Sequence, residues 1–276
     1  MSTALGPDPA PVLVARLRAA GCVFAEEEAA LLTDAAAESS DAAATPHAEA
    51  LERLVARRVA GEPLEQILGW AEFAGLRIAL EPGVFVPRRR TELVAAEAIA
   101  LVRAARRQGH TPVVVDLCCG AGAIGAAVAD AAGPIELVAA DLDPAAVRAA
   151  RRNLEPVGGL VAEGDLFDAL PAGLRGRVDV LAVNAPYVPT GEIAMMPPEA
   201  RDHEARIALD GGDDGLDVHR RVAASTRDWL APRGHVLIET SRRQAPTTAA
   251  LLAAVGLDVR IVRDEENGGT VAIGRA

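Results

Sequence analysis

Hydrophobic residues in the first quarter of the chain recur every three or four positions, which is the period of an amphipathic helix. The pattern predicts helices at 12–20, 26–37 and 47–60, and the small and polar residues at 38–46 predict a loop between the last two. We therefore expect a small helical domain at this end of the chain.

The period changes from helical to alternating near Gly75. Residues 76–80 alternate as a strand does, 81–83 contain the proline and glycine of a turn, and 84–86 can return antiparallel. The sequence therefore predicts a β-hairpin that joins the helical domain to the rest of the chain.

From Thr91 onward, short aliphatic segments alternate with helical ones, beginning with a helix that Thr91 can cap. The expected strands are 113–116, 137–141, 178–183, 235–239, 258–262 and 270–273, and the expected helices are 91–107, 122–132, 145–154, 216–230 and 247–255. This alternation is typical of an α/β fold in which helices cover both faces of a mostly parallel sheet. We thus expect a helical domain at 1–74, a hairpin linker at 75–90 and an α/β domain at 91–276.

The composition limits which residue types can form the core and which classes of partner the protein can bind. Half of the 276 residues are hydrophobic but only 3% are aromatic, so the core must be aliphatic. The formal net charge of −11 repels phosphates at long range and argues against a nucleic-acid partner. Lysine is absent, which excludes a Schiff-base lysine and the lysine of a phosphate-binding loop.

The sequence contains no pattern for a metal site or a membrane segment. The five histidines and three cysteines show no metal-ligand spacing, and the odd number of cysteines indicates no disulfide framework. The longest uncharged apolar run, 117–129, is too short to cross a bilayer, and no signal peptide opens the chain. We therefore expect a cytoplasmic protein without a bound metal.

A glycine-rich loop follows the first strand of the expected sheet. Gly120, Gly122 and Gly125 have the spacing of a dinucleotide-binding loop, and Asp141 stands at the end of the next strand. Asp116, at the start of the loop, favours a different ligand. A carboxylate there would repel a pyrophosphate, but it would attract the cationic amino-acid portion of S-adenosylmethionine.

We therefore expect S-adenosylmethionine as the cofactor of this loop. Its glycines would let the backbone approach the ligand closely. Asp141 could accept hydrogen bonds from ribose hydroxyls, although it would do so for either class of ligand. The expected cofactor-binding residues here are Asp116, Gly120, Ala121, Gly122 and Asp141.

A further strand end at 163–167 fits the adenine of such a cofactor. Asp165 or its neighbouring backbone can bond the exocyclic amine, and Leu166 or Phe167 can lie on the face of the ring. An ordinary turn with a buried phenylalanine is the alternative interpretation of this segment.

The motif Asn184-Ala185-Pro186-Tyr187 follows the strand expected at 178–183, so it faces the same edge of the sheet as the glycine loop. An amide or aromatic amine nitrogen is planar and a poor nucleophile. The side-chain oxygen of Asn184 and the carbonyl of Ala185 can accept its two N–H groups and hold it in plane, while Tyr187 stacks on it. Pro186 would fix the direction of the Ala185 carbonyl. Such orientation can supply much of the rate enhancement of methyl transfer without a strong base. A simple Asn-x-Pro turn without a catalytic role is the alternative interpretation of this motif.

Taken together and in this order, the motifs resemble the HemK-type protein-(glutamine-N5) methyltransferases. The likeness runs from about residue 51 to the end and is carried by 61–69, 73–76, 86–92, 116–122, 164–167, 208–217 and Asp141. It implies an N-terminal helical domain that recognises the substrate, a β-hairpin linker and a Rossmann-like class I methyltransferase domain. It also implies that S-adenosylmethionine is the donor and that the acceptor is the glutamine of the Gly-Gly-Gln loop in peptide-chain release factors, bound at 184–187. We expect Asn184 to contact the cofactor as well as the acceptor.

The chain departs from this family pattern at three positions. Ala185 stands where the family has the first proline of Asn-Pro-Pro-Tyr, Arg90 where it usually has an acid, and Ala205 where it usually has proline. The Ala185 carbonyl survives, so the departures bear on the substrate, which could be another protein glutamine, more than on the reaction. Three other functions stay open: methylation of an adenine amine in nucleic acid, hydride transfer with a nicotinamide cofactor, and non-catalytic binding of S-adenosylmethionine.

Overall fold

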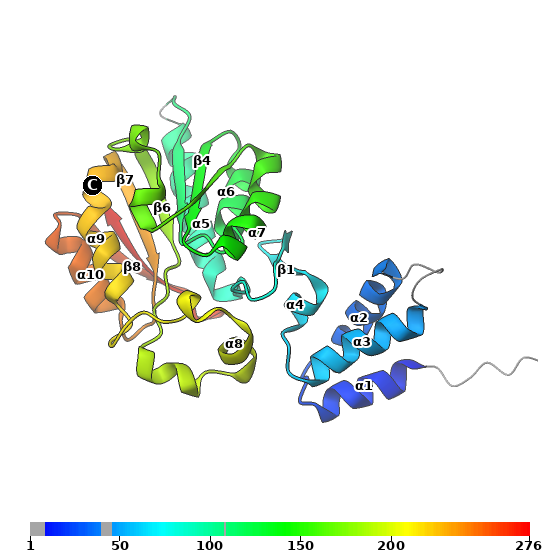
Figure 1. Cartoon of the computed structure of the whole chain (residues 1–276). Helices are drawn as coiled ribbons and strands as arrows, with labels where there is room; N and C mark the ends of the chain where they lie inside the picture. Colours follow the sequence, from blue (N-terminus) through cyan, green and yellow to red (C-terminus); the bar gives the residue numbers. More distant parts are fainter. Residues whose placement is uncertain (1–8, 40–45, 108) are drawn as a thin grey trace, which may run out of the picture. The chain divides into compact units, whose positions relative to one another are not determined.

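The computed structural model describes residues 9–39, 46–107 and 109–276. The chain forms two compact units, one from Met1–Gly69 with Pro197–His203 and the other from Trp70–Met196 with Glu204–Ala276. In the described residues the first contains helices alone and the second contains all the strands, so we name them the helical unit and the sheet unit (Figure 1). None of the described helices is both long and apolar enough to span a membrane.

The helical unit contains α1 (Pro9–Ala19), α2 (Ala25–Ser39), α3 (His47–Val59), α4 (Leu64–Leu68) and α8 (Pro198–His203), which confirms the helices expected at 12–20, 26–37 and 47–60. Its core is aliphatic and includes Leu13, Leu17, Leu32, Val55 and Ile67. The buried side chain of Arg58 joins three helices, because it contacts Glu28 of α2 at 2.6 Å and Glu199 of α8 at 2.5 Å. Residues 40–45 of the predicted loop lie outside the described residues.

The hairpin begins earlier than the sequence indicated. β1 (Trp70–Phe73) pairs antiparallel with β2 (Leu76–Ala79), and 84–86 do not form the expected return strand. The turn is Ala74-Gly75, whose φ angles of 51° and 79° are both positive, as in the two-residue turns that suit hairpin twist. Because alanine seldom takes a positive φ, this turn has no recognisable sequence signal.

A seven-stranded sheet in the order β5-β4-β3-β6-β7-β9-β8 forms the centre of the described sheet unit. Its strands are β3 (Val113–Leu117), β4 (Glu136–Asp141), β5 (Leu160–Glu163), β6 (Val178–Val183), β7 (Leu230–Glu239), β8 (Asp258–Arg263) and β9 (Thr270–Arg275). β9 runs antiparallel to both of its neighbours, and the other pairings are parallel. The expected α/β fold with a mostly parallel sheet is confirmed.

Helices cover both faces of this sheet (Figure 1). On one face lie α5 (Glu92–Arg106), α6 (Ala123–Ala132) and α7 (Pro144–Leu154), whose core includes Val114 of β3. On the other lie α9 (Asp217–Trp229) and α10 (Ala245–Ala254), whose core includes Val113 and Val115. Since side chains alternate along a strand, Asp116 points to the same face as Val114.

The start of α5 differs from the expectation that Thr91 caps it. Residues Arg89–Thr91 form a 3-10 turn that leads into α5, and the Thr91 side chain makes no capping hydrogen bond. The Thr91 backbone is already helical, with φ −72° and ψ −17°, whereas a capping residue is usually extended. Its hydroxyl oxygen instead accepts a hydrogen bond from Asn184 Nδ2 at 3.4 Å.

Candidate active site

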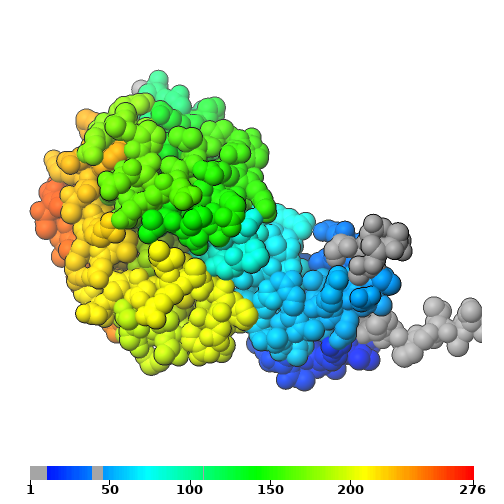
Figure 2. All heavy atoms as spheres, viewed as in Figure 1, coloured from blue at the N-terminus to red at the C-terminus, as the bar shows by residue number. Residues whose placement is uncertain are grey.

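The carboxyl ends of β3, β4 and β6 meet at a cavity of about 260 Å³. The predicted residues that line it are Gly120, Ala121, Asp141, Asp165, Leu166, Asn184, Ala185, Pro186 and Tyr187. The segment containing Ile207, yellow in Figure 2, lines the cavity together with the green segments that contain Asp141 and Asp165. In the described part of the chain no group of three or more histidine, cysteine or acidic residues could hold a metal ion.

The glycine loop needs its glycines for backbone geometry and for space. Gly120 and Gly122 have φ angles of 54° and 77°, in the left-handed region that favours glycine. A Cβ on Gly122 would lie 2.9 Å from Leu154 Cδ1 of α7, so Gly122 packs against α7 and, contrary to our expectation, does not line the cavity. Gly120 donates its N–H to the Asp141 carboxylate at 2.8 Å, and Asp143 donates to the same carboxylate at 2.9 Å. The structure thus joins the glycine loop to Asp141, as a shared cofactor site requires.

Asp116 does not face the cavity. It is 1% exposed and is not among the residues that line the cavity. Its Oδ2 accepts the N–H of Gly125 in α6 at 2.8 Å, while Oδ1 has no hydrogen-bond partner among the described residues. Burial raises the pKa of Asp116 to about 7. The structure therefore places Asp116 behind the glycine loop, on the α6 face of β3, and not in the wall of the cavity where we expected it.

Leu166, and not Phe167, faces the cavity. Leu166 has a φ of 51°, which interrupts the extended backbone at this point, and it lines the cavity. Phe167 is buried, stacks on Trp229 with ring centroids 5.6 Å apart and does not line the cavity, as the alternative of a buried phenylalanine in an ordinary turn predicts. Asp165 lines the cavity and accepts a hydrogen bond from Arg221 of α9 at 2.7 Å.

The residues 184–187, which we call the acceptor loop, follow β6 directly and reach the same cavity. Asn184 contacts Thr91 through its amide nitrogen, which leaves its side-chain oxygen able to accept a hydrogen bond from a ligand. Ala185 is 1% exposed and belongs to the core between the sheet and α9 and α10. The Ala185 side chain therefore packs inward beneath the loop.

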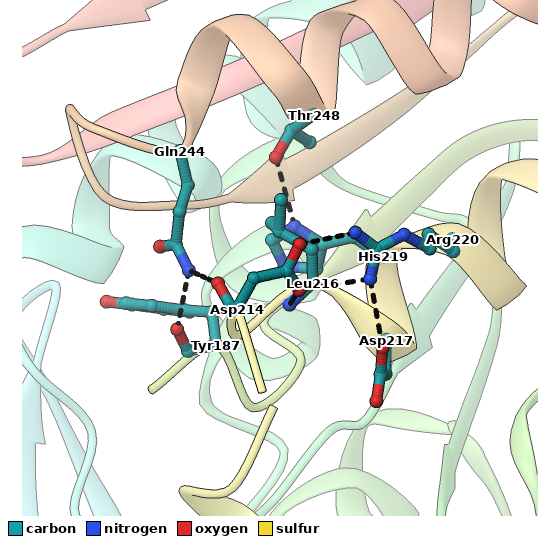
Figure 3. Close-up of polar contacts among 8 residues, drawn as sticks. All are labelled: Tyr187, Asp214, Leu216, Asp217, His219, Arg220, Gln244 and Thr248. Carbon is teal, nitrogen blue, oxygen red and sulfur yellow. Dashed lines mark hydrogen bonds and ion pairs between the residues drawn. The ribbon is translucent and has the colours of Figure 1, made fainter. Parts of the chain in front are cut away.

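Tyr187 is held at both ends. Its hydroxyl donates to Glu239 at 3.0 Å, and its backbone carbonyl accepts from Gln244 Nε2 at 2.9 Å. Burial and the Glu239 carboxylate raise the pKa of Tyr187, which keeps the hydroxyl protonated. Gln244 also donates to the Asp214 carbonyl at 3.0 Å, and the Tyr187 and His219 ring centroids lie 6.4 Å apart (Figure 3).

The stretch at 208–217 packs against the acceptor loop through its backbone. Val188 donates to the Leu209 carbonyl at 3.0 Å, and Gly211 donates to the Val188 carbonyl at 2.9 Å. Gly215 has a φ of 76°, and a Cβ there would lie 2.3 Å from the carbonyl oxygen of Tyr187. Position 215 therefore requires glycine, because the two backbones approach each other closely there.

Comparison with known proteins identifies the family. The model described as "Methyltransferase small domain" matches residues 75–200. The release factor glutamine methyltransferase of Geobacter sulfurreducens is 37% identical to the chain, with 78% of the chain and 73% of the relative covered. The chain belongs to the release factor glutamine methyltransferase family. The cofactor of this family is S-adenosylmethionine, so the nicotinamide alternative is set aside.

Another relative of similar identity has a different name. The 4-amino-L-phenylalanine/4-methylamino-L-phenylalanine methyltransferase of Streptomyces pristinaespiralis is 40% identical, with 73% of this chain and 69% of the relative covered. Among solved structures, a methyltransferase from Pyrococcus furiosus has a TM-score of 0.53 at 17% identity, with 80% of this chain and 96% of that chain covered. At that identity the likeness shows the fold alone.

One departure from the release factor glutamine methyltransferase pattern changes the backbone hydrogen bonds. Ala205 donates its N–H to the Gly83 carbonyl at 2.9 Å, a bond that proline could not make. The neighbouring Glu204 is buried and accepts from the N–H of Val86 at 3.1 Å and from Arg88 at 2.5 Å. The segment that continues into the cavity wall is therefore anchored to the residues after the hairpin.

Three residues of the site were not predicted from the sequence: Glu239, Gln244 and Arg221. Glu239 ends β7, the neighbour of β6, so an acid at this strand end was an available signal for a site residue. Gln244 and Arg221 act through hydrogen bonds to residues at least 30 positions away, which no local pattern indicates. These contacts depend on how the sheet unit folds.

Proposed function

We propose that the protein transfers the methyl group of S-adenosylmethionine to the side-chain amide nitrogen of a glutamine in a peptide-chain release factor. The observation that carries this proposal is the position of the acceptor loop. Its residues line the same cavity as Gly120 and Asp141, at the carboxyl ends of adjoining strands. The names of relatives that cover most of the chain, such as the one from Geobacter sulfurreducens, support this acceptor.

The residues present fit the proposed cofactor. Gly120 lines the cavity without a side chain and has a left-handed φ that favours glycine, so a ligand can approach its backbone closely. Asp141 can accept ribose hydroxyls in addition to its two backbone N–H groups, because each carboxylate oxygen has two lone pairs. Leu166 offers an apolar side chain to the adenine ring. When bound, S-adenosylmethionine supplies an electrophilic methyl group on a sulfonium.

The acceptor loop would orient the glutamine amide. The Asn184 side-chain oxygen and the Ala185 carbonyl would accept its two N–H groups, which holds the nitrogen in plane. The Tyr187 ring, fixed by Glu239 and Gln244, would lie on the flat amide. A strong base is not needed before transfer, since the amide nitrogen becomes acidic once it is alkylated. The protein's contribution is therefore mainly orientation.

A labelled-methyl assay tests this proposal. The full chain is incubated with labelled S-adenosylmethionine and purified release factor, beside the same factor with the glutamine of its Gly-Gly-Gln loop replaced by alanine, and beside DNA. We expect label in the unaltered factor alone. Label in the altered factor at the same rate would contradict the glutamine assignment, and label in DNA would support the adenine alternative.

A second candidate acceptor is the aromatic amine of a free amino acid. The relative from Streptomyces pristinaespiralis, whose name specifies 4-amino-L-phenylalanine, favours this candidate. An arylamine nitrogen is planar and has two N–H groups, so the same pair of acceptors would hold it. Transfer of label to 4-amino-L-phenylalanine, with none to release factor, would support this candidate over the first.

A further inference from the structure

Arg90 lies beside the proposed position of the acceptor nitrogen. It lines the cavity, and its guanidinium carbon is 6.0 Å from the centre of the Tyr187 ring. The next residue, Thr91, accepts a hydrogen bond from Asn184. Two consecutive residues thus contact the two ends of the acceptor loop, so Arg90 adjoins any group that the acceptor carries near its nitrogen.

Contacts at both its side chain and its backbone fix the position of Arg90. Arg90 Nε lies 3.3 Å from Glu239 Oε1, the same oxygen that accepts from the Tyr187 hydroxyl. Glu239 is 1% exposed, so this anchor is buried in the sheet unit. A Cβ on Gly269 would lie 2.6 Å from the Arg90 carbonyl oxygen, which shows that a second backbone presses on it.

The contacts with Glu239 and with Tyr187 use only part of the Arg90 guanidinium, since the side chain stays 43% exposed. Arg58 in the helical unit has a side chain 11% exposed and meets two carboxylates at 2.6 and 2.5 Å. Arg88 and Arg221, which also line the cavity, pair with carboxylates at 2.5 and 2.7 Å. Arg90 has a longer contact, and its side chain is 43% exposed. If Arg90 served only to neutralise Glu239, we would expect an equally close pairing.

We propose that Arg90 determines acceptor specificity by binding a carboxylate that the acceptor carries near its reacting nitrogen. This inference rests on the proposed transfer to a planar nitrogen. The carboxylate could come from an acidic residue close to a protein glutamine or from the α-carboxylate of a free amino acid, and the recognition chemistry is the same for both.

A guanidinium is suited to this task. Its planar donors can bind a carboxylate through two parallel hydrogen bonds. The wall of the cavity that Arg90 lines also includes apolar residues such as Phe85, Leu209 and Val218, which lower the dielectric in the cavity and strengthen the attraction. A matched acceptor without the carboxylate would leave the Arg90 donors exposed to water and unpaired with ligand.

The test compares matched acceptors with and without the carboxylate. One arm uses 4-amino-L-phenylalanine and 4-aminophenethylamine, and the other uses glutamine peptides with aspartate or asparagine beside the glutamine. Each acceptor is assayed with the wild-type chain, with Arg90→Gln and with the control Arg89→Gln. Arg89 is an exposed neighbour of the same charge that does not line the cavity.

We expect the wild type to prefer the carboxylate form of the acceptor it uses by about tenfold or more in kcat/KM, the size of a charge-assisted hydrogen-bond pair. Arg90→Gln should abolish this preference through KM, with kcat within about threefold of wild type. Arg89→Gln should keep the preference. Calorimetric binding of each pair, with S-adenosylhomocysteine present, should give the same ratio without turnover.

Two results would overturn the inference. Equal use and equal binding of the matched acceptors by the wild type would show that no carboxylate is recognised. Equal losses on both acceptors in Arg90→Gln would show that Arg90 serves only as the counter-ion of Glu239. If release factor is not methylated but the arylamines show the Arg90-dependent preference, the proposed function fails while this inference stands.

Discussion

Tyr187 depends on two separate contacts, one at its hydroxyl and one at its carbonyl. We predict that Tyr187→Ala, which removes the stacking ring, lowers kcat by about 100-fold or more because the acceptor is no longer oriented. Tyr187→Phe keeps the ring and loses only the hydrogen bond to Glu239, so it should lower kcat by roughly two- to tenfold.

Isothermal calorimetry with S-adenosylhomocysteine provides the control for these variants. Both should bind it as the wild type does, because the proposed cofactor contacts lie at the glycine loop and Asp141. A Tyr187→Ala variant that methylates as fast as wild type would show that the acceptor is bound elsewhere.

The stability of the protein should fall as the pH rises because of Asp116. Burial raises the pKa of Asp116 from 3.8 to about 7. Between these two pH values the folded chain therefore keeps a proton on Asp116 that the unfolded chain has released. Its contribution to stability is therefore complete below about pH 4 and is lost as the pH rises to about 7. We predict that Asp116→Asn loses less Tm over this interval than wild type, as measured by calorimetry across the pH range.

Two comparisons isolate this effect. Burial lowers the pKa of His219 to about 4, so the titration of His219 makes stability rise with pH over this interval. Because His219 is present in both proteins, its effect cancels when the Tm of wild type is compared with that of Asp116→Asn. Asp130→Asn changes an exposed acid on the same helix, α6, and should follow the wild type. Parallel Tm curves for wild type and Asp116→Asn would contradict the assignment.

The contact between the stretch at 208–217 and the acceptor loop makes a prediction about Gly215. A Cβ there would clash with the Tyr187 carbonyl and with Gln244, in addition to the strain of a positive φ. We predict that Gly215→Ala destabilises the fold by about 1–3 kcal/mol and lowers kcat at the same time, because Tyr187 must move. Chemical denaturation and initial rates measure the two effects.

Gly158→Ala is the matched control for this variant. Gly158 has a φ of 79°, close to that of Gly215, but an added Cβ there would have no heavy atom within 4 Å. It should incur the backbone strain and leave kcat unchanged. If Gly215→Ala also leaves kcat unchanged, the stretch at 208–217 does not position Tyr187.

Most of the order of strands and helices in the sheet unit could be predicted, because short aliphatic strands and amphipathic helices have distinct periods; of β5 only the strand end at Glu163 was indicated. A hairpin and its strand near 76–80 could be predicted too, but the position of its turn could not, since that turn uses Ala74 in a conformation that alanine rarely takes. The directions in which individual side chains point could not be predicted from the sequence either. Asp116 faces α6 because of its phase on β3, and Phe167 turns into the core because Leu166 before it has a positive φ.

The acceptor loop was predictable as a motif, but its supports were not. Asn184 and Tyr187 could be identified from their position after β6, one strand away from the glycine loop. Glu239, Gln244 and Arg90 reach them from β7, from the segment before α10 and from the turn before α5. Only the assembled sheet brings these segments together.

The chain divides into two compact units. We propose that the helical unit, expected from the sequence at 1–74, recognises the release factor and that the sheet unit carries out the chemistry. Val23 and Phe24, between α1 and α2, are 81% and 65% exposed. We predict that the double variant Val23→Ser/Phe24→Ser raises KM for release factor severalfold without changing kcat, since apolar contact area is lost.

Controls for the double variant separate docking from folding. KM for a short glutamine peptide should stay at the wild-type value, and Val157→Ser, which alters an apolar residue of the sheet unit that is 51% exposed, should change neither KM. An unchanged KM for release factor in the double variant would mean that this surface is not used.

The central claim is that the acceptor loop holds a glutamine amide for methylation, and fragmentation mass spectrometry of the product tests it most directly. Release factor is incubated with S-adenosylmethionine and either the wild-type chain or Tyr187→Ala, then digested and sequenced by fragmentation. We predict one added methyl on the side-chain nitrogen of the Gly-Gly-Gln glutamine with the wild type and none with the variant. A methyl on any other residue, or an equal yield from Tyr187→Ala, would contradict the account.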